Sequence, residues 1–222
     1  MTANNITRKT FNKSFLKNVQ SVFSYDTVSW TAELKEEITG YLVNKGFTSS
    51  DTGSNALVQC SNNNIVVMVS EKGVILSMEV GDYISFEHYV EIFSNIYGLF
   101  EKIGCSEINN FIFQKLNLYR IGMLKDGQKP TKDYTYRALF SNVVRENLPA
   151  FTDTTDPGYF YTIQPGFNEN EDYVVARLLI SSMRVSPVKL KDLVKELTHA
   201  NEKMYRLWYD ATSDRVKDLM SK

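Results

Sequence analysis

Side chains that could carry chemistry are few in this sequence. It contains two histidines, His88 and His199, and two cysteines, Cys60 and Cys105. Neither histidine has a second His or Cys at the spacing of a metal site, so the sequence predicts no transition-metal centre. Both cysteines lie in or beside apolar segments, where we expect buried free thiols, as in a reducing compartment. A nucleophile activated by histidine would need distant residues to converge, and no local signature indicates one.

Motifs that bind phosphates or cofactors are absent as well. The sequence contains neither G-x-x-x-x-G-K-[ST], typical of P-loops, nor G-x-G-x-x-G, typical of dinucleotide-binding folds. Acidic residues gather at Glu169, Glu171 and Asp172, in a predicted loop where we expect solvated carboxylates. We therefore assign no catalytic residue, no cofactor and no metal ligand, and a non-catalytic role is favoured over enzymatic activity.

One segment combines cations with aromatic rings. Between residues 120 and 137, basic side chains alternate with tyrosines, a combination that suits phosphate contacts and base stacking on single-stranded nucleic acid. Asp126 and Asp133 dilute this charge, and the net charge of −1 adds no attraction for a polyanion. An exposed loop on a scaffold is the favoured alternative. The residues of this candidate patch are Arg120, Lys125, Lys129, Lys132, Tyr134, Tyr136 and Arg137.

Aromatic and aliphatic side chains supply a candidate protein interface. The chain has 13 Tyr, 13 Phe and 2 Trp, and several of these rings crowd around predicted turns after residue 150. Exposed aromatic rings would favour binding to a partner protein, but aromatic residues are also common in the cores of sheets. Both interpretations, interface and core, stay open. Near the C-terminus, apolar residues at spacings of three and four form a seam that can dock within the chain or on a partner. The candidate interface residues are Leu190, Leu193, Leu197, Met204, Leu207, Trp208, Tyr159, Tyr161 and Phe167.

An α+β fold must position these candidates. Apolar runs at 65–69 and 74–80, joined by a polar link that ends in Gly73, predict a hairpin. Ser85 is the expected N-cap of a helix whose apolar stripe extends to Gly104. Residues 107–124 predict a long strand, while 11–25 and 56–60 predict two more. With a helix that begins after Ser29 or Thr31, the first half reads β-α-β-β-β-α-β.

The second half follows a polar break. Residues 126–133 contain Gly, Pro and charges but no apolar residue, which predicts a linker between an N-terminal half (1–125) and a C-terminal half (134–222), unless both form one continuous domain. We expect a helix at 134–147, a turn at 152–158, and strands at 159–164 and 173–183 around a loop at 165–172. A long C-terminal helix should begin after Ser186-Pro187 and be interrupted near 210–214. The expected architecture is mainly antiparallel sheet with helices packed on one face.

Composition bounds the class of protein. A chain of 222 residues with 43% apolar and 23% charged residues can bury a substantial core. No apolar run approaches the ~18 residues of a membrane span, and the polar N-terminus does not resemble a signal peptide. The sequence therefore predicts a soluble cytoplasmic protein with no membrane contact.

Two segments resemble a sporadically distributed bacterial family of uncharacterised proteins. The strand Lys115-Leu116-Asn117-Leu118-Tyr119-Arg120-Ile121 is similar to the family's L-x-L-R-Y-x-N strand, although Tyr119-Arg120 is inverted and Gly122 replaces Asn. The tail Leu193–Met220 resembles the family's C-terminal helix with a Thr-Asp-like cap and a final Met. The resemblance implies a cytosolic bacterial α+β protein, brings no activity, and suggests a mobile-element or defence context.

Together these features predict a non-catalytic protein-interaction or assembly subunit, whose partner is a second copy or another protein. The alternative is a nucleic-acid-associated accessory protein that uses the basic and aromatic patch at 120–137.

Overall fold

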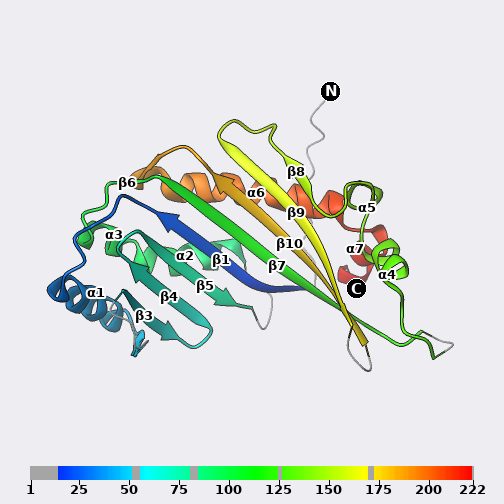
Figure 1. Cartoon of the computed structure of the whole chain (residues 1–222), viewed down its shortest axis with the longest axis horizontal. Coiled ribbons are helices and arrows are strands. Elements are labelled where there is room, and N and C mark those ends of the chain that lie inside the picture. Colours follow the sequence, from blue (N-terminus) through cyan, green and yellow to red (C-terminus); the bar gives the residue numbers. More distant parts are fainter. Residues whose placement is uncertain (1–14, 52–55, 81–84, 125–126, 170–172, 222) are drawn as a thin grey trace.

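Strands from the whole length of the chain build one sheet. The computed structural model describes residues 15–51, 56–80, 85–124, 127–169 and 173–221. Within these residues, nine strands form a fully antiparallel sheet in the order β2-β3-β4-β5-β1-β7-β10-β9-β8 (Figure 1). The strands are β1 (Leu16–Ser24), β2 (Thr48–Ser50), β3 (Leu57–Asn62), β4 (Ile65–Ser70), β5 (Gly73–Glu79), β7 (Asn110–Gly122), β8 (Phe151–Asp153), β9 (Tyr159–Glu169) and β10 (Tyr173–Arg184). Two short strands, β6 (Glu107–Ile108) and β11 (Val188–Lys189), pair separately.

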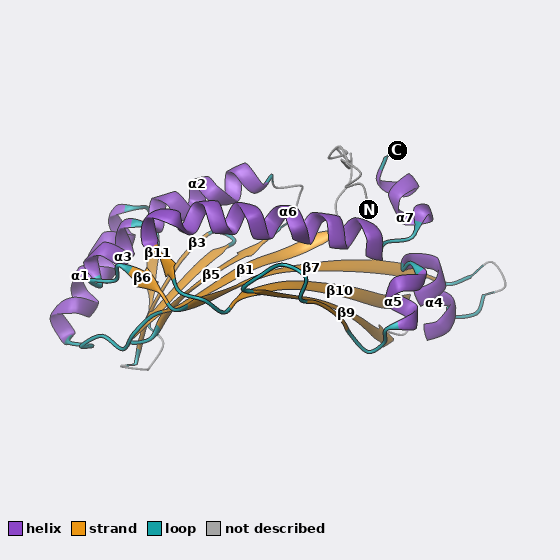
Figure 2. Cartoon of the chain, turned by 90° about the horizontal axis from the view of Figure 1, so that it is seen from above, coloured by secondary structure: helices purple, strands orange, loops and turns teal. Residues whose placement is uncertain are grey.

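Helices cover one face of this sheet. They are α1 (Ala32–Asn44), α2 (Phe86–Ile96), α3 (Gly98–Lys102), α4 (Lys132–Leu139), α5 (Asn142–Glu146), α6 (Leu193–Ala211) and α7 (Asp214–Met220), with a 3₁₀ turn at Leu190–Asp192. Figure 2 shows α1, α2 and α6 on the same side of the strands, while α4, α5 and α7 gather at one end. This arrangement confirms the predicted α+β class with helices packed on one face.

Buried and less buried residues alternate along the central strands, and the buried set forms the core. On β1, Val19 and Phe23 are buried, and the ring of Phe23 lies 5.3 Å from Phe93 of α2 and 5.6 Å from Phe100 of α3. On β7, the residues of the same face include the fully buried Phe113, whose ring lies 5.4 Å from Tyr89 of α2. Every second residue of a strand therefore packs against the helices, which stabilise the sheet mainly through buried apolar area.

Local signals place the first helices as predicted. The side chain of Thr31 accepts a hydrogen bond from the Leu34 amide at 3.2 Å and caps α1, and Ser85 caps α2 in the same way. The predicted single helix after Ser85 is instead two helices. The backbone N–H of Tyr97 bonds to Ser94, three residues back, and Gly98, a weak helix former, follows.

The predicted loop at 165–172 is wrong over 165–169, because β9 continues to Glu169 (170–172 lie outside the described residues). Pro165 fits there since β8 pairs only with residues 161–163 of β9, so the outer edge at Pro165 needs no backbone donor. Gly166 fits because Arg177 of β10 crosses it: a Cβ at Gly166 would lie 2.2 Å from the Arg177 Nε atom. Part of the predicted turn at 152–158 is strand β8.

Two predicted helices also have different bounds. The helix at 134–147 is divided into α4 and α5 by the buried Phe140, which forms a bridge with Thr212. The C-terminal helix begins at Leu193 and not after Ser186-Pro187, because Val188 and Lys189 pair with β6. The predicted interruption near 210–214 is confirmed: α6 ends at Ala211 and α7 begins at Asp214.

Strands from both halves of the sequence share the sheet. β7 from the first half pairs with β10 from the second half over twelve residue pairs. The loop after β7 therefore joins two parts of one sheet rather than two separate sheets.

Candidate interaction surface

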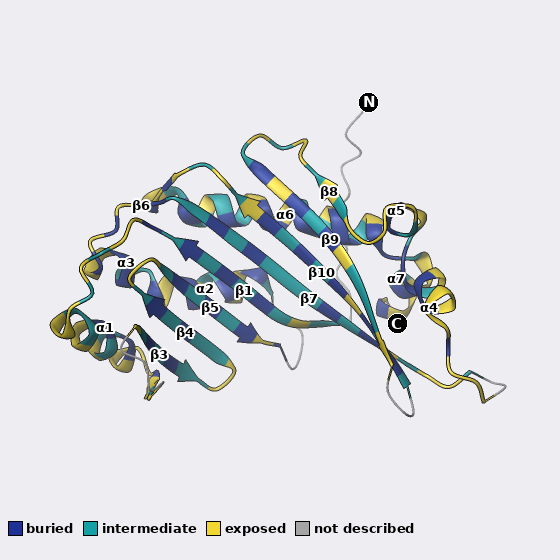
Figure 3. Cartoon of the chain, viewed as in Figure 1, coloured by how far each residue is buried: buried dark blue, intermediate teal, exposed yellow. Residues whose placement is uncertain are grey.

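The other face of the sheet has no helix on it within the described residues. Figures 1 and 3 look onto this face, with the helices behind the strands. Figure 3 shows buried residues alternating with less buried ones along the central strands. The less buried set points away from the helices, and we call the surface that it forms on β3, β4, β5, β1, β7, β10 and β9 the open face.

An apolar row crosses the open face. Strand register places apolar residues opposite one another on six successive strands, and cross-strand neighbours of this kind lie ~4.5–5.5 Å apart at Cβ. The two side chains at the β10–β9 end of the row are the most accessible, with Phe160 44% and Met183 39% exposed. In strand order, the row consists of Met68, Ile75, Val22, Ile112, Met183 and Phe160.

A parallel row of uncharged polar residues lies next to the apolar row. The Gln114 side chain of β7 donates a hydrogen bond to the Ser181 hydroxyl of β10 at 3.1 Å, which links the two central strands. Charged residues of the open face, such as Glu79, Arg120 and Arg177, lie outside both rows. The centre is thus uncharged, as in the cores of protein interfaces. The polar row consists of Ser77, Gln20, Gln114, Ser181 and Thr162.

A shallow hollow of about 340 Å³ lies at one end of the apolar row. Val22, Met68 and Ile75 of the row line it together with Leu57 of β3. A hollow beside a flat apolar surface can receive a protruding side chain, the usual anchor of a protein interface.

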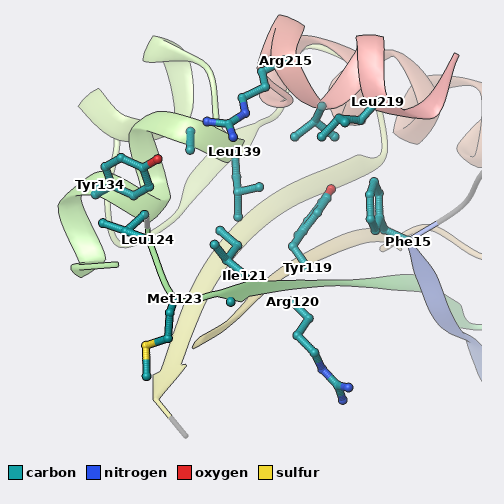
Figure 4. A pocket seen from close by; sticks show the side chains of 13 residues that line it. Phe15, Tyr119, Arg120, Ile121, Met123, Leu124, Tyr134, Leu139, Arg215 and Leu219 are labelled. Atoms are coloured by element: carbon teal, nitrogen blue, oxygen red, sulfur yellow. The ribbon is translucent and has the colours of Figure 1, made fainter. Parts of the chain in front are cut away.

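The basic and aromatic patch predicted at 120–137 is divided between two surfaces. Arg120 projects from the open side of β7, where its guanidinium carbon lies 4.5 Å from the centroid of the Tyr173 ring. Tyr134, 40% exposed, lies on the other side of that strand (Figure 4). Lys129 is exposed, and Lys125 lies outside the described residues. Arg120 and Tyr134 cannot therefore contact the same few nucleotides.

The α4 part of that patch is already engaged within the chain. Tyr136 is only 6% exposed, so its ring is not available for base stacking. The Arg137 guanidinium pairs with the Asp133 carboxylate at 3.0 Å, and Lys132 lies 5.5 Å from the Tyr136 ring centroid. The prediction of one continuous nucleic-acid patch is corrected accordingly.

The candidate interface residues of the C-terminal seam lie in the chain's own core. The seam packs on the sheet, which is the first of the two alternatives for it. Tyr159 and Tyr161 are buried under α6, and Phe167 is half-buried with its ring 6.5 Å from Tyr136. These residues are therefore not a surface for a partner in this conformation. The buried seam residues are Leu190, Leu193, Leu197, Met204, Leu207 and Trp208.

A polar network that the sequence did not predict ties α6 to the edge of the sheet. The Tyr161 hydroxyl donates to Asp156 Oδ2 at 2.8 Å, and His199 Nε2 lies 2.6 Å from the same oxygen. The Tyr159 hydroxyl donates to Glu196 Oε2 at 2.5 Å. The signal that could have revealed it is the spacing of Glu196, His199 and Lys203, which places three polar residues along one side of α6.

Protonation in this network favours a structural role. Burial raises the pKa of Tyr159 and Tyr161, and the neighbouring carboxylates raise it further, so both phenols remain protonated donors. Burial alone would raise the pKa of Asp156, but hydrogen bonds from His199 and Tyr161 outweigh it and hold that pKa below its usual value. The carboxylate thus already accepts two donors, and the network cross-links helix and sheet.

Ligands for a metal do not converge in the described part of the chain, where no group of three or more His, Cys, Asp or Glu could hold an ion. Cys60 and Cys105 are buried free thiols, as predicted, and burial raises the pKa of each. Among the described helices, none is both long and apolar enough to cross a membrane.

Comparison with protein-family models and with curated proteins finds no match to this chain.

Proposed function

We propose that this chain is a protein-interaction or assembly subunit that binds its partner through the open face. The observation that carries the proposal is the apolar row across six strands, which ends in the exposed Met183 and Phe160. Hydration of a contiguous row of apolar side chains is unfavourable, so covering the row with another protein is stabilising.

The size of the open face suits such a contact. Six strands at ~4.8 Å and the two uncharged rows at ~6.8 Å span on the order of 400 Å², which suits the centre of an interface in which each partner buries ~800 Å². The uncharged rows can be desolvated without stranding a charge, whereas the peripheral Glu79, Arg120 and Arg177 can remain solvated.

The proposal includes a context, a bacterial cytosolic system associated with mobile elements or defence. Its support is the resemblance of residues 115–121 and 193–220 to a sporadically distributed bacterial family. The partner is either a second copy or another protein of that system.

The test places a charge at the exposed end of the apolar row. Met183→Lys should abolish binding of the partner, because a desolvated ammonium without a counter-charge is unfavourable in an interface. Light scattering at two concentrations measures self-association, and quantitative affinity purification from the native cell measures capture of another protein.

Val43→Lys is the matched control, since Val43 is 49% exposed on α1, away from the open face. The expected result is association or capture by the wild type and by Val43→Lys, and its loss in Met183→Lys. A wild-type chain that stays monomeric and captures nothing, or equal behaviour of the three proteins, would contradict the proposal.

A second candidate, a nucleic-acid-associated accessory protein, has one observation in its favour. Arg120 and Arg177 lie near each other on the open face, because Arg177 pairs with Leu118, two residues before Arg120. Binding of single-stranded DNA or RNA should then be strongest at low salt and weaken in Arg120→Gln. Failure to bind at low salt rules this candidate out.

A further inference from the structure

A pocket of about 700 Å³ lies at the far end of β7, between this strand, α4 and α7 (Figure 4). It opens on the side of β7 opposite to Arg120, so it is separate from the open face. The volume is in the range of small-molecule sites in proteins, ~300–1,000 Å³. The side chain of Arg120 points away from the pocket, to the other side of β7 (Figure 4). The residues that line the pocket are Phe15, Tyr119, Arg120, Ile121, Gly122, Met123, Leu124, Tyr134, Ala138, Leu139, Arg215, Val216 and Leu219.

The walls are apolar and partly open to solvent. Leu139 and Val216 are buried at 7% and 1% exposure, whereas Leu219, Met123 and Tyr134 keep 48%, 45% and 40% of their surface exposed. Three exposed large apolar side chains of the described chain thus surround a single hollow. An apolar ligand would bury them and gain the corresponding hydrophobic free energy.

One cation stands at the mouth of this pocket. Arg215 extends from α7 toward α4 above Leu139 (Figure 4). Its neighbour Asp214 pairs with Lys217 at 3.2 Å, and among the described residues no carboxylate pairs with Arg215. No acidic side chain lines the described pocket. The site is therefore complementary to one negative charge beside an apolar body.

Tyr119 adds a neutral wall to the site. Burial raises the pKa of this phenol to about 12, although nearby Trp208 and Thr212 lower it somewhat. The hydroxyl thus remains uncharged at neutral pH and does not repel an anion.

We propose that this pocket binds a small amphipathic carboxylate, of the medium-chain fatty acid class. The chain would lie against Ile121, Leu139 and Leu219, and the carboxylate would pair with Arg215 at the mouth. A phosphate group fits less well. At the neighbouring N-termini of α4 and α7, one backbone N–H already donates to the Thr131 or Ser213 side chain, which leaves fewer donors for the several oxygens of a phosphate.

Calorimetric titration of the full chain tests the assignment. The probes are dodecanoate, methyl dodecanoate and dodecyltrimethylammonium, each below its critical micelle concentration. Dodecanoate should bind most tightly with one molecule per chain, and each methylene removed from it should weaken binding by up to about fourfold. The cationic probe should bind least, because Arg215 repels it.

Two variants with matched controls separate the contribution of the Arg215 charge to ligand binding from that of the apolar side chains. Arg215→Gln should weaken dodecanoate binding about tenfold and leave the methyl ester unchanged. Arg206→Gln, at an exposed arginine of α6 that does not line the pocket, should change neither. Leu219→Ser should weaken both ligands, whereas Val43→Ser, at a similarly exposed apolar residue on α1, should not. Unchanged circular dichroism confirms that each variant is folded.

Several outcomes would overturn the proposal. These are absence of dodecanoate binding, binding of the cationic probe as tight as that of dodecanoate, or an equal loss in Arg206→Gln and Arg215→Gln. Equal affinity for dodecanoate and its methyl ester would show a neutral apolar occupant, such as a side chain of a partner protein, and would also refute the carboxylate assignment.

Discussion

Asp153, the last residue of β8, shows how one side chain can make stability depend on pH. Its carboxylate accepts a hydrogen bond from the Thr155 hydroxyl at 2.7 Å and pairs with Lys203 of α6 at 2.9 Å. Burial alone would raise the pKa of Asp153, but these partners outweigh it and lower that pKa to about 2. A carboxyl group whose pKa is lower in the folded state stabilises the fold above its unfolded pKa of ~3.9 and loses that contribution toward pH 2.

We expect Asp153→Asn to lower the free energy of unfolding by about 1 kcal/mol at pH 7, a value reduced for solvent screening of the lysine partner. The difference from the wild type should shrink between pH 4 and pH 2, as the wild-type carboxyl group becomes protonated. Urea denaturation at pH 7, 4 and 2.5 measures it. Asp214→Asn is the control, since Asp214 is 96% exposed and should contribute little at any pH. A difference that stays constant with pH would contradict the assignment.

At the scale of elements, α2 is held to β1 by a buried polar contact as well as by rings. The hydroxyl groups of Ser21 and Tyr89 form a hydrogen bond in the core. Burial raises the pKa of Tyr89, so the phenol stays protonated and remains able to donate. The contact fixes the position of the helix along the strand, because sliding by one residue would leave two buried hydroxyl groups without partners.

Tyr89→Phe should lower the free energy of unfolding by about 1–2 kcal/mol, since it leaves the Ser21 hydroxyl buried without its partner. Ser21→Ala should cost a similar amount for the same reason. Chemical denaturation of the two single variants and the double variant measures their coupling. The double variant should lose less than the sum of the two, and strict additivity would show that the hydroxyl groups do not stabilise each other.

Elements set by local signals could be predicted from sequence, and elements set by distant contacts could not. The cap at Thr31 and the hairpin around Gly73 depend on neighbouring residues, and both form as expected. The course of β9 through Pro165 depends on how far β8 extends, and nothing near Pro165 records that. The first turn of the C-terminal helix was likewise displaced by pairing of Val188 with the distant Ile108.

The candidate surface was harder to predict than the fold. Both sets of alternating residues on β7 are apolar, Phe111 and Phe113 on one side and Ile112 on the other, so periodicity alone does not tell which set is covered. Cross-strand register decides it, because Ile112 stands between Val22 and Met183. Arg120 and Tyr134 look like one patch in the sequence, yet the strand separates them.

At the scale of the molecule, the pairing of β7 with β10 joins both halves of the chain into one sheet. We therefore expect the halves to unfold together. The chain has two tryptophans, Trp30 before α1 and Trp208 in α6, so each half carries its own fluorescent probe.

Trp30→Phe and Trp208→Phe each leave a single tryptophan. The comparison is made within each variant, between the fluorescence of that tryptophan and the circular dichroism of the whole chain. In either variant, the tryptophan signal and far-ultraviolet circular dichroism should change at the same denaturant concentration, as expected for one cooperative unit. A fluorescence midpoint that departs from the circular dichroism midpoint would show that the halves unfold separately.

The ends of the sheet limit how copies of this chain can combine. The terminal strands, β2 and β8, have three residues each, and β9 carries Pro165 where it extends past β8. Short borders interrupted by proline offer a poor template for adding strands side by side. Concentrated protein should thus resist growth into cross-β fibrils, and any contact between copies should be a closed one, broad side against broad side.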